Sequence, residues 1–143
     1  MMSSEYRSRI LLVEDYDDAR EMYSEYLTFS GYEMSQAANG LEAIRQALAS
    51  RPHIVVMDLS LPEMDGWETT RRLKADERTA DIPILALTGH VLTDFSKRAR
   101  QAGFEGFLTK PCLPEELVAE IKRILETRGR SLEEEGTRAR GTD

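Results

Sequence analysis

Short apolar segments alternate with amphipathic segments along most of this chain, and this alternation limits the possible folds more than any other feature. The apolar segments cover residues 9–13, 32–37, 53–58, 82–88 and 106–109. They have the length of strands, whereas the segments that follow them place apolar residues at helical spacing. Strands that alternate with helices predict an α/β fold with a parallel sheet covered on both faces.

Residues that favour helix ends support this interpretation. Gly31 and Gly103 follow two of the helical segments, the second at residues 92–102, and glycine commonly ends a helix. The last helical segment has Pro114 near its start, a position that suits proline. Three segments, including the one that Gly31 ends, begin at residues that can cap a helix N-terminus, namely Asp17 or Asp18, Asn39, and Asp65.

The length and composition fit one globular domain followed by a charged tail. The chain has 143 residues, of which 41% are apolar and 31% charged, and this is enough for a single hydrophobic core. We expect a flexible segment at residues 1–8, a folded domain at residues 9–127 and a disordered tail at residues 128–143. The tail is charged and almost without apolar residues.

Charge and cysteine content restrict the environment and the partners. The 26 acidic residues outnumber the 19 lysines and arginines, and the net charge of −7 argues against direct nucleic-acid binding and against a membrane surface. The single cysteine, Cys112, permits no internal disulfide and fits a reducing compartment. No segment resembles a signal peptide or a membrane span. The expected location is the cytoplasm.

Polar residues follow or end four of the five predicted strands. Glu14 and Asp15 follow the first strand, Asp58 ends the third, Thr88 ends the fourth and Lys110 follows the fifth. In an open parallel sheet, ligands bind beyond the carboxyl ends of the strands. We therefore expect three acids, a hydroxyl and a lysine to meet at one edge of the sheet.

This combination of groups suits phosphoryl transfer to an aspartate. Clustered carboxylates repel one another unless they share a cation, and a few carboxylates with water positions left over suit Mg²⁺. An aspartate beside the metal can act as a nucleophile towards phosphorus. The metal, a lysine and a hydroxyl can then stabilise the charge on the phosphoryl oxygens. Asp58 ends the strand that looks most deeply buried, and we infer that it is the nucleophile.

Four sequence pieces carry a resemblance to a known family: LLVEDYDD at residues 11–18, VVMDLSLPEMDGWE at 55–68, ILALTGH at 84–90 and GFLTKP at 106–111. There are 30 positions from Asp58 to Thr88 and 52 from Asp58 to Lys110. In this order and at these separations, the pieces resemble the receiver domain of two-component response regulators, the chemotaxis-regulator-like family. The resemblance extends over about residues 9–127. It implies a flavodoxin-like (βα)5 sandwich with strand order 2-1-3-4-5.

The resemblance also implies roles at the sheet edge. Asp58 would accept the phosphoryl group, and Asp15 and Asp58 would ligate Mg²⁺ directly. Glu14 would act on the metal through water, and the backbone carbonyl of Ser60 would complete the metal site. Lys110 would form an ion pair with the phosphoryl group.

Three further expectations come with the resemblance. Thr88 would hydrogen-bond the phosphoryl oxygen and act as a switch residue together with Phe107, although plain core packing of Phe107 is an equal alternative. The Lys110–Pro111 peptide bond would be cis and would help to aim the lysine. Activation would change the surface formed by the fourth helix, the fifth strand and the fifth helix.

The implied partners are proteins. A sensor histidine kinase or a histidine phosphotransfer protein would donate the phosphoryl group, and a downstream protein target would read the changed surface. Phosphorylation could also produce a homodimer. A receiver catalyses only its own phosphorylation and dephosphorylation, so we do not expect an enzyme with an independent substrate.

Other functions fit the sequence less well. A phosphohydrolase of the haloacid-dehalogenase type expects a second aspartate two residues after its nucleophile, where this chain has Ser60. A flavin-binding protein needs backbone and hydroxyl donors in its first loop, whereas residues 14–18 are acidic. Two alternatives to a free-standing regulator stay open: a degenerate receiver that binds partners without phosphorylation, and a receiver fragment of a larger response regulator or hybrid kinase.

Overall fold

The computed structural model describes residues 7–89 and 95–140, without the side chains of residues 95, 96 and 130–140. Strands and helices alternate throughout this part of the chain. The strands are β1 Arg9–Val13, β2 Glu33–Ala37, β3 Ile54–Asp58, β4 Ile84–Thr88 and β5 Gly106–Thr109. The helices are α1 Asp17–Phe29, α2 Gly40–Ser50, α3 Gly66–Ala75, α4 Phe95–Ala102 and α5 Pro114–Arg140.

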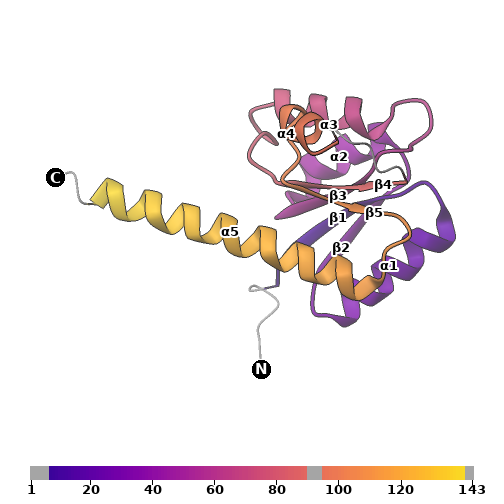
Figure 1. Ribbon diagram of the computed structural model, residues 1–143, viewed down its shortest axis with the longest axis horizontal. Coiled ribbons are helices and arrows are strands. Elements are labelled where there is room, and N and C mark those ends of the chain that lie inside the picture. Colours follow the sequence, from indigo (N-terminus) through magenta and orange to yellow (C-terminus); the bar gives the residue numbers. More distant parts are fainter. Residues whose placement is uncertain (1–6, 90–94, 141–143) are drawn as a thin grey trace.

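The five strands form one parallel sheet with the order β2-β1-β3-β4-β5. This confirms the predicted fold and strand order. Helices α2, α3 and α4 cover one face of the sheet, and α1 and α5 cover the other (Figure 1). The central strand β3 pairs with β1 on one side and with β4 on the other, so its last residue, Asp58, lies opposite Leu87 of β4.

Successive residues of the central strands enter two separate cores, because side chains alternate between the faces of a strand. In β3, Val55 and Met57 pack in the core under α2, α3 and α4, whereas Ile54 and Val56 pack in the core under α1 and α5. Every residue of β3 and β4 is buried. This explains why the sequence of these strands lacks the apolar–polar alternation of a sheet with one solvated face.

Two of the three predicted N-caps are confirmed. The side chain of Asn39 accepts a hydrogen bond from the amide of Glu42, and the side chain of Asp65 accepts one from the amide of Glu68. The prediction for α1 was wrong, because Tyr16 occupies the N-cap position and makes no side-chain capping bond. Asp17 already belongs to the first turn.

The other helix ends agree with the sequence where they are described. Gly31, after the C-cap Ser30 of α1, and Gly103, directly after α4, adopt φ angles of 101° and 100°, in the left-handed region that glycine tolerates best. The structure places the start of α4 at Phe95. Residues 90–94, which include the start of the helix predicted at residues 92–102, lie outside the described residues.

Helix α5 is longer than expected. The sequence suggested a folded domain up to residue 127 and a disordered tail at 128–143, but the helix continues to Arg140 and runs out beyond the sheet (Figure 1). Arg128 donates a hydrogen bond to the carbonyl of Asp81, which ties this part of α5 to the domain. Glutamate and arginine, which are frequent after this point, favour helix, and adding residues to an existing helix avoids the cost of nucleation.

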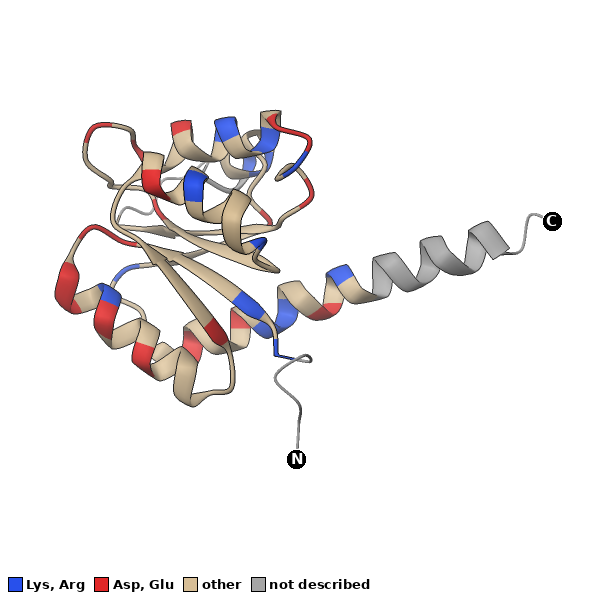
Figure 2. Ribbon diagram, turned by 180° about the vertical axis from the view of Figure 1, so that it is seen from behind, with Lys and Arg blue, Asp and Glu red and all other residues tan. Residues whose placement is uncertain are grey.

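The segment 1–8 is described only in its last two residues. Among the described residues, no helix combines the length and hydrophobicity needed to cross a membrane. Acidic residues are frequent along α1 and in the loop before it, whereas lysines and arginines are frequent on α3 and α4 (Figure 2).

Candidate functional site

The carboxyl ends of β1, β3, β4 and β5 lie along one edge of the sheet, as parallel pairing requires. Backbone hydrogen bonds continue two of the ladders beyond the strands. The amide of Leu59 donates to the carbonyl of Leu87 over 3.0 Å, and the amide of Lys110 donates to the carbonyl of Thr88 over 2.6 Å. The sheet therefore fixes the backbone that carries the site.

Lys110 forms ion pairs with two buried acids at this edge. Its ammonium nitrogen Nζ lies 3.0 Å from Oε1 and 3.3 Å from Oε2 of Glu14, and 3.2 Å from Oδ2 of Asp58. Glu14 and Asp58 are both only 2% exposed. Three groups that the sequence separates widely are thus in direct contact.

Glu14 and Asp58 both pair with the Lys110 ammonium, and their pKa values shift in opposite directions. Burial, followed by the neighbouring Asp58, raises the pKa of Glu14 to about 7 in spite of Lys110. Burial alone would raise the pKa of Asp58, but hydrogen bonds with Glu14 and the Ser60 amide, together with Lys110, lower it below its ordinary value. Burial opposes the charge of Lys110, yet the two acids raise its pKa. Asp58 therefore keeps its charge to a lower pH than Glu14 does.

The loop after β3 holds the carboxylate of Asp58 from the other side. The amide of Ser60 donates to Oδ1 of Asp58 over 3.0 Å. Helix α3 then begins so close to the strand that a Cβ atom on Gly66 would lie 2.5 Å from the carbonyl oxygen of Asp58 and 2.7 Å from Cα of Leu59. Only glycine allows this approach of the helix to the strand end.

Three carboxylates are placed to share a metal ion. Glu14, Asp15 and Asp58 each offer an oxygen atom, and these atoms lie within 4.8 Å of one another. Asp15 is exposed, whereas the other two are buried. The structure therefore brings together the three acids that the sequence singled out, while the part of the Ser60 carbonyl in metal binding stays a prediction.

The remaining predicted site residues lie on the adjoining strands. Thr88 is the last residue of β4 and is 5% exposed. Phe107 lies on β5 and is 37% exposed, so it is not a fully buried core residue. The Lys110–Pro111 peptide bond is cis. The switch roles of Thr88 and Phe107 stay predictions.

Two contacts made by α1 were not anticipated. Arg20 donates from Nη1 to the backbone carbonyl of Glu14 over 2.9 Å, and the hydroxyl of Tyr23 donates to the backbone carbonyl of Cys112 over 2.8 Å. No sequence spacing identifies them, because their acceptors are backbone atoms of other elements.

Comparison with known proteins identifies the family of this chain. Residues 10–122 match the family model of the response regulator receiver domain. The chain belongs to this family. The polar-differentiation response regulator DivK of Brucella anthropi is 34% identical over 116 residues, which cover 81% of this chain and 94% of DivK. The folded part of this chain is thus a receiver domain of the two-component response regulators.

Two further relatives place receiver domains inside other proteins. PhoB, the phosphate regulon transcriptional regulatory protein of Pseudomonas aeruginosa, is 38% identical over 120 residues, which cover 84% of this chain but 52% of PhoB. This chain therefore spans about half the length of PhoB. The receiver domain of the sensor histidine kinase PA1611, also from P. aeruginosa, is 35% identical with a TM-score of 0.71, and the match covers 85% of this chain and 96% of that domain. That structure has a magnesium ion coordinated in its active site cleft.

Proposed function

We propose that this receiver domain accepts a phosphoryl group on Asp58 from a phosphohistidine of a sensor histidine kinase or a histidine phosphotransfer protein. The observation that carries the proposal is the placement of the Asp58 carboxylate. It is buried at the end of the central strand and held between the Lys110 ammonium, 3.2 Å from Oδ2, and the Ser60 amide, 3.0 Å from Oδ1. A nucleophile fixed in this way keeps its alignment with a phosphoryl donor.

The residues around Asp58 divide the work of the transfer. The bond between phosphorus and the histidine nitrogen breaks while a bond to an Asp58 oxygen forms, and the donor histidine leaves with its electron pair and takes up a proton. Lys110, which carries a positive charge beside Asp58, is placed to pair with the phosphoryl oxygens. Thr88 would donate its hydroxyl to one of them.

The donor set at this edge suits Mg²⁺. Two carboxylates are buried next to one another beside the Lys110 ammonium, and burial together with Asp58 raises the pKa of Glu14 to about 7. A divalent cation held by Asp15 and Asp58, with Glu14 acting through water and the Ser60 carbonyl as a further ligand, would remove this repulsion. When bound, the metal neutralises charge on the phosphoryl oxygens.

The output would be a change of surface. Phosphorylation adds nearly two negative charges beside Thr88 and Lys110. We expect Thr88 to move towards the new oxygens, Phe107 to turn inward, and the surface of α4, β5 and α5 to change its affinity for a downstream protein. A phosphorylation-dependent homodimer is a second possible readout of the same surface. The protein would catalyse its own phosphorylation and dephosphorylation and no independent reaction, and it would act in the cytoplasm without direct nucleic-acid binding.

The test is the intact mass of the protein after incubation with acetyl phosphate and Mg²⁺. We expect a phosphoryl adduct in the wild-type protein and none in the Asp58→Asn variant or in EDTA. Absence of the adduct with acetyl phosphate and with phosphohistidine donors, together with no spectral response to beryllofluoride, would leave the alternative of a receiver that binds partners without phosphorylation. Whether the chain acts alone or as part of a larger regulator or hybrid kinase does not change this outcome.

A further inference from the structure

Helix α1 contacts the candidate site from two directions. On the acidic side, Arg20 donates to the backbone carbonyl of Glu14 over 2.9 Å. On the side of the lysine, the hydroxyl of Tyr23 donates to the backbone carbonyl of Cys112 over 2.8 Å and lies 3.6 Å from its sulfur atom. Helix α1 therefore contacts both Glu14, which pairs with the Lys110 ammonium, and the turn that begins at Lys110.

The turn between β5 and α5 needs such an anchor. Among the described residues, β5 is an edge strand that pairs with β4 alone, and its last backbone bond before the turn joins the Lys110 amide to the Thr88 carbonyl. Pro111 has no amide hydrogen to donate, and Leu113 is 60% exposed. Cys112, which is 7% exposed, is the residue of the turn that enters the core.

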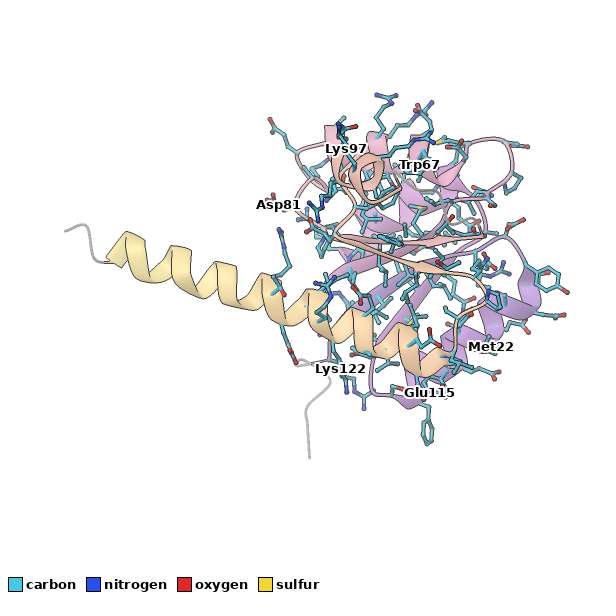
Figure 3. The ribbon with its side chains drawn as sticks, in the orientation of Figure 1. Met22, Trp67, Asp81, Lys97, Glu115 and Lys122 are labelled. Carbon is cyan, nitrogen blue, oxygen red and sulfur yellow. The ribbon has the colours of Figure 1, made fainter. Side chains whose placement is uncertain are left out.

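Tyr23 meets Cys112 in a setting that strengthens their hydrogen bond. Tyr23 is 6% exposed, and its ring packs in the same core as Cys112 and Leu117 of α5. Burial raises the pKa of the Tyr23 phenol, so the hydroxyl stays protonated and remains a donor. A buried carbonyl that lost this donor would be left without a partner, which is costly away from water. Figure 3 shows the two elements together: Met22, next to Tyr23 on α1, and Glu115, in the first turn of α5, lie at the same end of the molecule.

We propose that Tyr23 is a positioning residue for Lys110. Its hydroxyl fixes the carbonyl of Cys112, two residues after Lys110, and thereby holds the start of the turn so that the ammonium meets Glu14 and Asp58. The inference rests on the proposed function only for the readout that measures phosphoryl transfer. The position of Lys110 can also be measured without phosphoryl transfer.

The test uses the Tyr23→Phe variant, which keeps the ring and removes only the hydroxyl. Its matched control is Tyr26→Phe, the same substitution one turn further along α1, where the ring is half-buried and the hydroxyl has no hydrogen-bond partner among the described residues. The first readout is the rate at which an acylating reagent modifies Lys110 in the metal-free protein, measured by peptide mass spectrometry with the exposed Lys97 as internal reference. We expect Lys110 to react about 3–10-fold faster in Tyr23→Phe, the range that the loss of one hydrogen bond gives, and at the wild-type rate in Tyr26→Phe.

The second readout is phosphorylation by acetyl phosphate at saturating Mg²⁺. We expect the rate of adduct formation to fall about 3–10-fold in Tyr23→Phe while the Mg²⁺ concentration for half-maximal rate changes less than about twofold, because the three acids are untouched. A general loss of structure would change both values.

Two results would overturn the inference: wild-type reactivity of Lys110 in Tyr23→Phe, or equal changes in Tyr23→Phe and Tyr26→Phe. If the wild-type protein takes up no phosphoryl group, the proposed function fails, and the acylation rates still decide whether Tyr23 positions Lys110.

Discussion

The ammonium of Lys110 lies 3.0 Å from Oε1 of Glu14, although 96 positions separate the two residues in the sequence. Glu14 is 2% exposed and has Asp58 beside it as well as Lys110. One lysine thus balances two buried acids. The imbalance is a source of instability in the metal-free protein, and it has measurable consequences.

Replacing Glu14 by glutamine should stabilise the metal-free protein at high pH. The pKa of Glu14 rises from its ordinary 4.5 to about 7, chiefly through burial, so the folded protein holds this proton more tightly than the unfolded chain. The resulting stability is fully present below about pH 4.5 and is lost as the pH rises through about 7. In urea unfolding with EDTA at pH 8, we expect Glu14→Gln to be more stable than wild type by about 1–3 kcal/mol. Equal midpoints at pH 8, or the same gain in the exposed control Glu21→Gln, would contradict this.

Magnesium should stabilise the wild-type protein through the three clustered acids. An ion that binds the folded protein alone stabilises it by about 2.7 kcal/mol at 100 times its dissociation constant. We expect Mg²⁺ to raise the melting temperature of the wild-type protein and to raise that of Asp15→Asn much less, since Asp15 is one of the three clustered acids. The variant Asp18→Asn, which changes a nearby exposed acid outside the cluster, is the control. An equal response of all three proteins would place the metal elsewhere.

His53 should contribute to the loss of stability in mild acid. Its Nδ1 atom accepts the amide hydrogen of Arg9 over 2.8 Å. Burial and the charge of Arg9 lower the pKa of His53, against a weaker opposite effect of Glu33. The contribution of the neutral ring is therefore present above about pH 6.5 and is lost as the pH falls through the lowered folded value.

The variant His53→Asn tests this, because its side-chain oxygen can accept the same hydrogen bond without titrating. Between pH 7.5 and pH 5, we expect the urea midpoint of His53→Asn to fall less than that of the wild-type protein. A fall of the same size in both proteins would remove His53 from the explanation.

Adding a methyl group at Gly66 should disturb the end of β3. A Cβ atom there would lie 2.5 Å from the backbone oxygen of Asp58, and neither the paired strand nor the capped helix can move freely. We expect Gly66→Ala to lose about 1–3 kcal/mol of stability. The control Gly129→Ala has open space around its Cβ position on α5 and should gain slightly in helix stability. Wild-type stability of Gly66→Ala in chemical denaturation would show that the strand end and α3 are less rigid than the structure shows.

Trp67 should report the position of α4. The guanidinium of Arg98 on α4 lies 4.4 Å from the centre of the Trp67 ring on α3, and the ring of Phe104 packs edge-on against Trp67 with centroids 5.2 Å apart. Figure 3 shows Trp67 beside α4, near Lys97. We expect Arg98→Gln to change the emission of this single tryptophan and to cost less than about 1 kcal/mol. Arg100→Gln on the same helix should change neither, and an unchanged emission spectrum in Arg98→Gln would mean that the stacking does not persist in solution.

Much of the fold could be predicted because its signals are local. Five apolar segments of strand length, each followed by a helical pattern, indicate a parallel sheet, and Asn39 and Asp65 mark two helix starts that the structure confirms. The N-cap of α1 was predicted wrongly because aspartate is favourable in the first turn of a helix as well as at the N-cap, and Asp17 and Asp18 lie in the first turn. The length of α5 was missed because composition does not show that Arg128 is held by the carbonyl of Asp81.

The sequence by itself determined which residues stand at the ends of the strands, and therefore which acids, hydroxyl and lysine can meet. This follows from chain order, since parallel strands bring their carboxyl ends to one edge whatever side chains surround them. Only the tertiary structure decided how these groups are paired and supported. The contacts of Lys110 with Glu14 and Asp58, and of Tyr23 with the carbonyl of Cys112, join positions 96, 52 and 89 residues apart. Their geometry depends on how α1, α5 and the sheet pack together, and no local pattern in the sequence encodes it.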